Sequence, residues 1–381
     1  MRILTLSYEF PPIGGGGSGV VKGLSEEFVR NGHSVDVVTM GFRGLSEEEL
    51  VNGISVYRVD CGRNSESKCT AREALRYVLK ARPKVRELMS KNDYDIVHTH
   101  FIFPDGVIAL KEVAPTGIPY VITAHGSDVP GYNPKLFFRL VHPFLVHLWR
   151  QVTRASALLV SPSETLAHLI EAVKPGTPVA VIPNGISGDK FTPDQKKEQI
   201  LVATRLVQRK GVQYLLKALA DQSIGWPAII VGSGEYEDAL RALNEELGTP
   251  AKMVGWISNE SDEFRDLLQQ SAAYALPSDF ENFPVCLLEA MAAGSAIVTT
   301  KGHGCEEVVG DAAELVTTGA ENKERCVQDI RAALQRITTE PGYSESLGQR
   351  ARARLENNFT WQAVSQKYVA AYDEYALKQK P

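Results

Sequence analysis

The chain has 381 residues, of which 44% are hydrophobic and 23% charged, a composition typical of a globular protein and not of a disordered or fibrous one. Its net charge of −5 argues against nucleic-acid binding, and no apolar run approaches the roughly 18 residues of a membrane-spanning helix. The first residues do not resemble a secretory signal and the five cysteines are scattered, so we expect a cytoplasmic, two-domain protein without a zinc site or disulfide framework.

Short aliphatic and β-branched runs alternate with amphipathic helical segments from the start of the chain. A strand is expected at residues 3–7, a helix at 20–30 and a second strand at 34–39. Further strands are expected at 95–99, 119–123, 157–160 and 178–182. This βαβ rhythm predicts a parallel sheet. In such sheets ligands bind at the carboxyl ends of the strands, so the residues that follow these strands are site candidates.

The rhythm breaks at Pro183-Asn184-Gly185, and the polar segment that continues to Gln199 has linker composition. It then restarts, with strands expected at 200–203, 228–231, 252–254, 273–276 and 296–299. A second α/β domain therefore follows the first. The end of the chain, from Trp361 onward, is rich in aromatic residues at helical spacing, so it is expected to pack on a surface.

A glycine loop lies between the first strand and the first helix. It contains Gly14-x-Gly16-x-x-Gly19, where the backbone can approach a ligand closely and the helix N-terminus favours an anion. The pattern also matches a dinucleotide fingerprint, but the turn is long and the nearest acid, Asp36, falls early in the second strand. A mobile loop without a ligand is a further alternative.

Two basic residues follow the first strand of the second domain. Arg205 and Lys210 combine a fork-shaped guanidinium with an ammonium, which together suit a diphosphate. The alternative is that both side chains are merely solvated.

Two carboxylates are expected near one helix N-terminus. Pro284 suits a first helical position, which places Glu281 in the preceding loop and Glu289 inside the helix. A carboxylate accepts from both hydroxyls of a ribose or hexose diol, while free amides of the first turn bind phosphate. The alternative is a helix-start acid followed by an exposed helix residue.

These motifs occur together in one known family. The chain resembles the retaining glycosyltransferases of family 4 (glycosyl transferases group 1, GT-B fold) in the glycine loop, Ala124-His125-Gly126-Ser127-Asp128, Arg205-Leu206-x3-Lys210-Gly211 and Glu281-x7-Glu289. The resemblance covers essentially the whole chain. It implies an α/β protein with two Rossmann-like doubly wound domains that face each other across a cleft. Residues 1–185 would bind the acceptor, residues 186–359 the donor, and the tail, 360–381, would pack back on the first domain.

The resemblance also implies roles for individual residues. Arg205, Lys210, Glu281 and His125 would be the catalytic residues, with the two cations on the donor diphosphate and the other two side chains at the transferred sugar. Glu289 would hold the ribose. The remaining donor-binding candidates are Gly16, Gly17, Met253, Phe283, Pro284 and Val285, with Met253 near the base. Thr204, Asn282 and His303 stand where the family commonly has glycine, which affects donor choice and leaves the charged residues in place.

The implied reaction moves a hexose from a nucleoside-diphosphate sugar, with UDP-sugars favoured, to a hydroxyl of a sugar, lipid-linked or small-molecule acceptor. No cofactor or metal ion is expected, because fixed cations and helix termini can stabilise the departing diphosphate. The family is thought to react on one face of the sugar, with the phosphate taking the acceptor proton. A nucleotide-sugar epimerase of the same fold and a non-catalytic nucleotide-sugar binding protein are the alternatives.

His100 and Asp128 are candidates for the acceptor side. His98 and His100 lie two apart on an expected strand and so share a face. With His125 and Asp128 they could ligate a metal ion, but a polar rim of the acceptor cleft is favoured, with His100 the better placed. Asp128 is equally suited to cap the following turn.

Two segments, residues 68–91 and 132–150, combine basic residues with apolar ones at helical spacing. Such helices can lie on anionic membranes, which would place the protein at the inner face of the membrane. Ordinary helices with one buried and one solvated face are the alternative.

Overall fold

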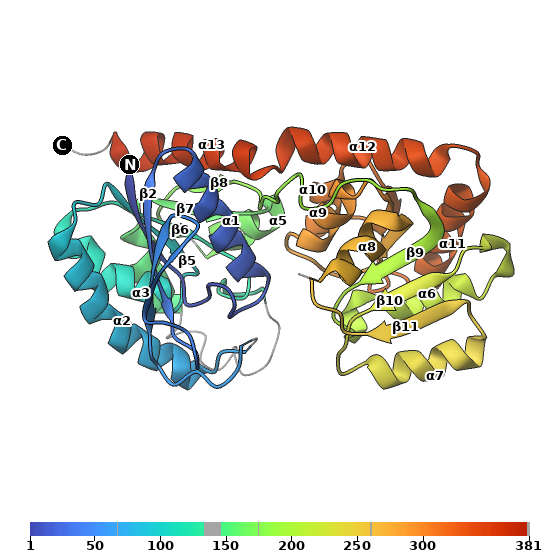
Figure 1. Cartoon of the computed structure of the whole chain (residues 1–381), viewed down its shortest axis with the longest axis horizontal. Helices are drawn as coiled ribbons and strands as arrows, with labels where there is room; N and C mark the ends of the chain where they lie inside the picture. Colours follow the sequence, from blue (N-terminus) through green and yellow to red (C-terminus); the bar gives the residue numbers. More distant parts are fainter. Residues whose placement is uncertain (67, 133–145, 174, 260, 379–381) are drawn as a thin grey trace. The chain divides into compact units, whose positions relative to one another are not determined.

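The computed structural model describes residues 1–66, 68–132, 146–173, 175–259 and 261–378 (Figure 1). The chain divides into two compact units, one formed by Met1–Gly185 with Trp361–Pro381 and the other by Ile186–Thr360. Each unit is a mostly parallel sheet with helices on both faces.

The sheet of the N-terminal unit has eight strands in the order β3-β4-β2-β1-β5-β6-β7-β8. Every neighbouring pair is parallel except β3 and β4, which form an antiparallel hairpin at one edge. The strands are β1 (Arg2–Leu6), β2 (Ser34–Met40), β3 (Glu48–Val51), β4 (Ile54–Val59), β5 (Ile96–His100), β6 (Tyr120–Thr123), β7 (Leu158–Ser161) and β8 (Val179–Val181).

Two apolar clusters cover the two faces of this sheet. One contains residues of α1 and α13, and the other contains residues of α2, α3 and α5. The helices and helical turns are α1 (Gly16–Arg30), α2 (Ala71–Lys91), α3 (Asp105–Ile108), η1 (Ala109–Val113), η2 (Ala114–Thr116), α5 (Glu164–Ala172), α13 (Trp361–Tyr372) and η5 (Asp373–Leu377).

The C-terminal tail is part of the N-terminal unit. Trp361, the first residue of α13, packs where Gly23 of α1 and Gly185 leave room for an indole, since a Cβ at either glycine would lie within 2.5 Å of that ring. Farther along α13, Tyr368 and Tyr372 are buried in the cluster that covers α1. The last residues, 379–381, lie outside the described part of the chain.

The sheet of the C-terminal unit has six parallel strands in the order β11-β10-β9-β12-β13-β14. Numbered within the unit this is 3-2-1-4-5-6, the strand order of Rossmann domains. The strands are β9 (Lys197–Ala203), β10 (Ala228–Val231), β11 (Ala251–Gly255), β12 (Ser271–Leu276), β13 (Ala296–Thr300) and β14 (Glu314–Val316).

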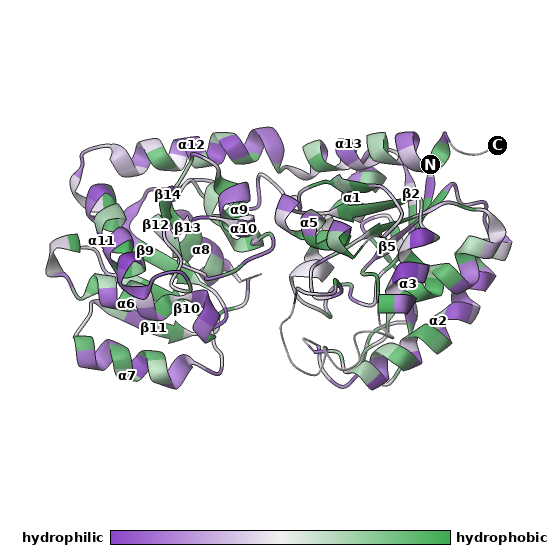
Figure 2. Cartoon of the chain, turned by 180° about the vertical axis from the view of Figure 1, so that it is seen from behind, coloured by the Kyte–Doolittle hydropathy of each residue, from purple (hydrophilic) through white to green (hydrophobic). Residues whose placement is uncertain are grey.

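Two apolar clusters again lie on the two faces of the sheet, one built largely from α6 and α11 and the other from α8, α9, α10 and α12. In Figure 2 the strands of both units are mostly hydrophobic, whereas the helices carry hydrophilic patches. The helices and helical turns are η3 (Gln208–Lys210), α6 (Val212–Leu219), η4 (Gln222–Ile224), α7 (Glu237–Leu247), α8 (Asp262–Gln270), α9 (Val285–Ala292), α10 (His303–Val309), α11 (Lys323–Thr339) and α12 (Tyr343–Asn358).

The polar segment after Gly185 belongs to the C-terminal unit. Phe191 is fully buried there, and β9 begins at Lys197, three residues earlier than predicted. Lys196 donates to the carbonyl oxygens of Gln269, Ser271 and Ala293, and burial lowers its pKa to about 8. The composition of this segment predicted a linker, because nothing in the local sequence indicates that Lys196 will donate to distant backbone carbonyls.

Among the helices that the structure describes, none combines the length and apolar character needed to cross a bilayer. All five cysteines are free of disulfide bonds.

Candidate functional site

The donor residues predicted in the C-terminal unit lie where its strand order reverses. Strands β9 and β12 are neighbours, and the chain continues from them toward opposite edges of the sheet. Ligands bind at the carboxyl ends of the two strands that flank such a reversal. Arg205 and Lys210 follow β9, and Glu281 follows β12. The topology therefore brings these three predicted residues to one edge of the sheet.

Lys210 and Glu281 form a buried ion pair at this edge. The Lys210 ammonium donates to Glu281 Oε1, and Ser278 Oγ donates to the same oxygen at 2.8 Å. The two charged side chains are only 10% and 11% exposed. An ammonium has three N–H donors, so Lys210 retains donors for an anionic ligand while it remains paired. Ser278 lay within the predicted motif but had no role assigned to it.

Backbone contacts hold the loop before Lys210 against the loop before Glu281. The Arg209 carbonyl oxygen accepts from Asp279 N at 2.8 Å and lies 3.2 Å from Ser278 Oγ. Gly211 has φ of +73°, and a Cβ there would lie 1.8 Å from the Pro277 carbonyl oxygen. Only glycine fits this position, and its presence lets the two loops touch.

Asn282 and His303, two of the residues predicted to stand in place of glycine, lie near this loop. His303 has φ of +53°, in the left-handed region that favours glycine, and its ring lies 4.7 Å from that of Phe280. The carbonyl of Asn282 faces Gly304, where a Cβ would be 1.6 Å from that oxygen. The backbone shape of the loop is thus kept by neighbouring glycine and by strain at His303.

Helix α9 begins at Val285 with Pro284 as its N-cap, so Pro284 lies one residue before the first helical position predicted for it. Proline offers no side-chain cap, and the first-turn amides, including that of Val285, point out of the helix start. Phe283 packs edge-to-face on Phe359 with the ring centroids 5.8 Å apart. Glu289, inside α9, is 6% exposed and is not the exposed helix residue of the alternative interpretation.

Arg205 lies in the loop that follows β9, and Met253 lies on β11. Both strands are on the same side of the reversal point. Arg205 is exposed and Met253 is half-buried. A glycine turn that sequence reasoning did not single out follows β10. A Cβ at Gly232 would lie 1.9 Å from Thr204 O and one at Gly234 2.2 Å from Leu206 O, so this turn packs directly on the loop that carries Arg205. A Gly-x-Gly after a strand was the available signal.

The glycine loop lies at the corresponding reversal in the N-terminal unit, between β1 and β5. Helix α1 begins at Gly16, and its N-cap, Gly15, provides no side-chain cap. The Gly15 amide donates to Glu9 Oε2 at 3.2 Å. A Cβ at Gly17 would lie 2.9 Å from the Phe101 ring, so this glycine lets the helix start approach the end of β5. These contacts hold the loop at Gly15 and Gly17, whereas the Cβ positions of Gly15 and Gly16 are open.

His125 and His100 are in contact inside the N-terminal unit. His100 Nδ1 lies 3.1 Å from His125 Nε2, and the two rings stack with centroids 5.4 Å apart. Burial lowers the pKa of His125 to about 4 and that of His100 well below its ordinary value, so both rings are neutral at pH 7. His100 is thus buried and in contact with His125, which is only half-buried. The proposed role of His100 toward an acceptor stays a prediction.

Asp128 organises the loop after β6. Its carboxylate accepts from the backbone amides of His125 at 3.0 Å, Gly126 at 2.9 Å and Ile102 at 2.8 Å. Burial raises its pKa. These contacts are those of the turn cap considered as an alternative, and they tie the loop that carries His125 to the end of β5.

The fourth residue of the metal alternative, His98, has both ring nitrogens engaged. Nε2 lies 2.8 Å from Thr123 Oγ1 and Nδ1 lies 2.8 Å from the Tyr372 hydroxyl. Within the described ranges, no group of three or more His, Cys, Asp or Glu residues is arranged to hold a metal ion.

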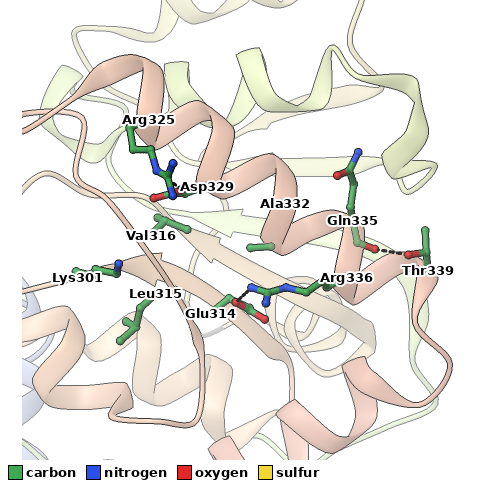
Figure 3. Close-up of a pocket in the computed structure, with 11 residues that line it drawn as sticks. Lys301, Glu314, Leu315, Val316, Arg325, Asp329, Ala332, Gln335, Arg336 and Thr339 are labelled. Carbon is green, nitrogen blue, oxygen red and sulfur yellow. Dashed lines mark hydrogen bonds and ion pairs between the residues drawn. The ribbon is translucent and has the colours of Figure 1, made fainter.

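A pocket of about 540 Å³ lies elsewhere in the C-terminal unit, between β14 and α11 (Figure 3). It contains none of the predicted site residues. Four of its five charged side chains form ion pairs within the pocket, Arg325 with Asp329 at 2.8 Å and Arg336 with Glu314, and the fifth is the exposed Lys301. Because most of these charges are already paired, we favour the reversal point as the candidate site.

Two family models match consecutive parts of the chain, Glycosyltransferase Family 4 over residues 14–190 and Glycosyl transferases group 1 over residues 185–354. An uncharacterized glycosyltransferase of Methanocaldococcus jannaschii is 26% identical over 399 residues, which cover 98% of each chain. Among solved structures, sucrose-phosphate synthase from Thermosynechococcus elongatus has a TM-score of 0.79 at 19% identity, with 98% of each chain covered. The chain belongs to the GT-B glycosyltransferases.

A second solved structure supports the same fold. Anabaena HepE in complex with UDP and glucose has a TM-score of 0.74 with this glycosyltransferase at 18% identity, and the match covers 98% of this chain and 100% of HepE. The predicted fold class, α/β with two Rossmann-like domains, is confirmed. Lys210 and Glu281 of this glycosyltransferase fall within the part matched by the group 1 model, and His100 and His125 within the part matched by the Family 4 model.

Proposed function

We propose that this glycosyltransferase is a retaining, metal-independent hexosyltransferase of family 4 that uses a nucleoside-diphosphate sugar, with UDP-sugars favoured. The observation that carries the proposal is the buried Lys210–Glu281 pair at the reversal point of the donor sheet. An ammonium beside a carboxylate suits a ligand that carries both a diphosphate and sugar hydroxyls. Proteins of the same fold bind different nucleotides, UDP in HepE and ADP in starch synthase IV from Arabidopsis thaliana, so UDP and ADP are the first two nucleotides to test.

Each donor residue has a distinct proposed task. Arg205 and Lys210 neutralise the diphosphate, assisted by the backbone amides of Gly16, Gly17 and Val285. Glu289 accepts from the ribose hydroxyls. Glu281 accepts from hydroxyls of the transferred sugar. Phe283 and Pro284 shape the loop between Glu281 and α9, and the backbone near Met253 reads the base.

The proposed transfer accounts for every bond, electron pair and proton with the donor and the acceptor alone. The bond between the anomeric carbon and the diphosphate oxygen breaks, and its electron pair leaves with the diphosphate. The acceptor oxygen bonds to the same face of the anomeric carbon, while its proton passes to the departing phosphate oxygen. Glu281 Oε1 already accepts from Lys210 and Ser278, which suits a binding carboxylate better than a nucleophile. Fixed cations stabilise the developing charge without reorganisation.

The acceptor side is proposed for the N-terminal unit, where His125 contacts the sugar or supports its reacting face. His100 and Asp128 were predicted on this side, and both act on the loop that carries His125. The acceptor is proposed to be a sugar, a lipid-linked molecule or another small hydroxyl compound.

We expect one nucleoside diphosphate to raise the unfolding temperature of the purified protein. A ligand present at about 100 times its Kd stabilises the folded state by roughly 2.7 kcal/mol. Thermal unfolding would be followed with UDP, GDP, ADP and NAD in parallel. Because Arg205 is exposed, Arg205→Ala should abolish the shift without lowering the unliganded midpoint, whereas Arg241→Ala, an exposed arginine on α7, should leave the shift intact.

A shift with NAD alone, or with none of the four, would overturn the donor assignment. Incubation with the matching sugar nucleotide then separates the alternatives. Transfer or slow hydrolysis identifies a transferase, an epimerised sugar nucleotide identifies an epimerase, and binding without turnover identifies a non-catalytic binding protein.

We also propose a peripheral contact with anionic membrane at the inner face, through one face of α2. Leu75 and Leu79, one turn apart, are 57% and 60% exposed. The cations Arg72, Arg76 and Lys80 are exposed beside them. Apolar side chains flanked by cations suit a bilayer surface, where each cation contributes about 1 kcal/mol. The other predicted segment, 132–150, lies largely outside the described residues, and Trp149 at its end is buried.

Co-sedimentation with phosphatidylglycerol vesicles at low salt should detect this contact. Leu75→Ser with Leu79→Ser should release the protein into the supernatant. Trp256→Ser removes an apolar side chain of the other unit that is even more exposed, at 71%, and should leave binding unchanged. A wild-type protein that stays in the supernatant at low salt would end the membrane proposal.

A further inference from the structure

Strand register places three histidines in a row on one face of the N-terminal sheet. Strands β5 and β6 are parallel neighbours, with His98 opposite Val121 and His100 opposite Thr123. Side chains two residues apart share a face of a strand. His98 and His100 on β5, and Thr123 with His125 just beyond β6, therefore lie on the same face, toward the end of the sheet where the proposed site is.

The contacts along this row run without interruption. The His98 and His100 rings lie 4.3 Å apart, centroid to centroid. The next contact is that of His100 Nδ1 with His125 Nε2 at 3.1 Å. On its other side, His125 Nδ1 lies 3.8 Å from the position that a Cβ at Gly17 would occupy. One nitrogen of His125 thus faces His100 and the other lies toward the glycine loop.

A neutral imidazole carries one N–H, so the contact between two neutral rings links their tautomers. If His100 Nδ1 donates, then His125 Nε2 must accept and its proton is on Nδ1. If His125 Nε2 donates, its Nδ1 becomes an acceptor. Burial, the main cause of the lowered pKa of both rings, keeps them neutral at pH 7, so one of these two arrangements must hold.

The carboxy-terminal helix fixes the far end of the row. The hydroxyl of Tyr372 on α13 lies 2.8 Å from His98 Nδ1, and that of Tyr368 lies 3.0 Å from Thr123 Oγ1, which in turn lies 2.8 Å from His98 Nε2. The His98 ring therefore has both nitrogens bonded. The His100 ring packs against it with the two ring planes 34° apart.

We infer that His100 is a positioning residue, which orients the His125 ring and fixes its tautomer through the contact between His100 Nδ1 and His125 Nε2. The inference rests on the proposed role of His125 at the transferred sugar. A ring held by a second hydrogen bond keeps its orientation and tautomer through a reaction cycle. His100 would act on turnover through His125 alone.

Three substitutions at His100 separate this role from simple packing. Asparagine places an amide near Nδ1, glutamine places one near Nε2, and phenylalanine keeps the ring shape without any polar atom. We expect His100→Phe and His100→Gln to lower kcat about 10- to 100-fold with a smaller change in the KM of the donor. We expect His100→Asn to retain most of the wild-type kcat. If packing alone mattered, phenylalanine would be the best tolerated and asparagine the worst.

A double-variant comparison tests whether His100 acts through His125. In a His125→Asn background, His100→Phe should cause no further loss of kcat. An additional loss of the full 10- to 100-fold would overturn the inference, as would a His100→Phe enzyme with wild-type kcat.

The tautomer itself is measurable without turnover. In protein labelled with 15N in its histidines, the His125 ring signals, assigned by their loss in His125→Asn, should shift in His100→Phe and stay near the wild-type values in His100→Asn. Unchanged His125 signals in His100→Phe would refute the inference even if the enzyme's donor were unknown. An absence of transfer by the wild type would instead count against the proposed function and leave the spectroscopic result standing.

Discussion

Replacing Lys210 with methionine is expected to lower kcat by about 100- to 1,000-fold, the usual effect of removing one group that stabilises developing charge. It should also destabilise the protein, because Glu281 would be left as an uncompensated buried charge. Breaking a buried pair in this way costs about 3–5 kcal/mol. Turnover of the sugar nucleotide and denaturant-induced unfolding, measured on the same preparations, check the two effects.

A double variant separates the two effects. Lys210→Met with Glu281→Gln removes both charges, so we expect it to regain most of the lost stability while turnover stays low. Lys217→Met, which removes an exposed lysine on the neighbouring helix α6, should change neither quantity. A double variant that regained full turnover would show that the pair serves stability only, and the proposed phosphate site would have to be abandoned.

Gly211→Ala is expected to destabilise the C-terminal unit by on the order of 4 kcal/mol, which is at the upper end for single substitutions. The new Cβ would lie 1.8 Å from the Pro277 carbonyl oxygen, and neither backbone segment can yield without separating the loops that carry Lys210 and Glu281. Activity should therefore fall even at temperatures where the variant is folded. Chemical denaturation and turnover at 20 °C below the midpoint measure both losses.

Gly225→Ala is the matched control for this prediction. Gly225 has φ of +71°, almost the same as the +73° of Gly211, but no atom lies within 4 Å of its Cβ position. Gly225→Ala should therefore lower the free energy of unfolding only by the cost of a left-handed conformation for alanine, roughly 1–2 kcal/mol. Equal stabilities of the two variants would mean that the Pro277 contact is not what requires glycine at 211.

Most strands and helices could be predicted from the sequence, and the charged candidates could be selected from it, because both depend on local patterns. Buried parallel strands such as β1, β5 and β12 are short apolar runs, and the motifs follow them directly. The hairpin of β3 and β4 was missed because Glu48 and Glu49 give β3 no apolar run. Its Asn52-Gly53 turn, with φ of +49° and +85°, is typical of two-residue hairpins and was an unused signal.

Pairings between distant residues could not be predicted. The bond between Lys210 and Glu281 spans 71 residues and depends on β9 and β12 being neighbours. The contact of His100 with His125 depends on the register of β5 with β6. The residue pattern of a single strand does not indicate how that strand is aligned with its neighbour. His98 and His100 were expected at a polar rim of the acceptor cleft, whereas each is only 1% exposed, and Tyr368 and Tyr372 of α13 pack on His98.

The position of α13 has a consequence for how the chain folds during synthesis. Trp361, Val364, Tyr368 and Tyr372 fill one face of the first sheet, yet they are made after the whole C-terminal unit. Domains usually fold in order from the N-terminus as they are made. Here the apolar surface that α13 covers has no partner while the C-terminal unit is being made, so the packing of the N-terminal unit is completed only after α13 has been synthesised.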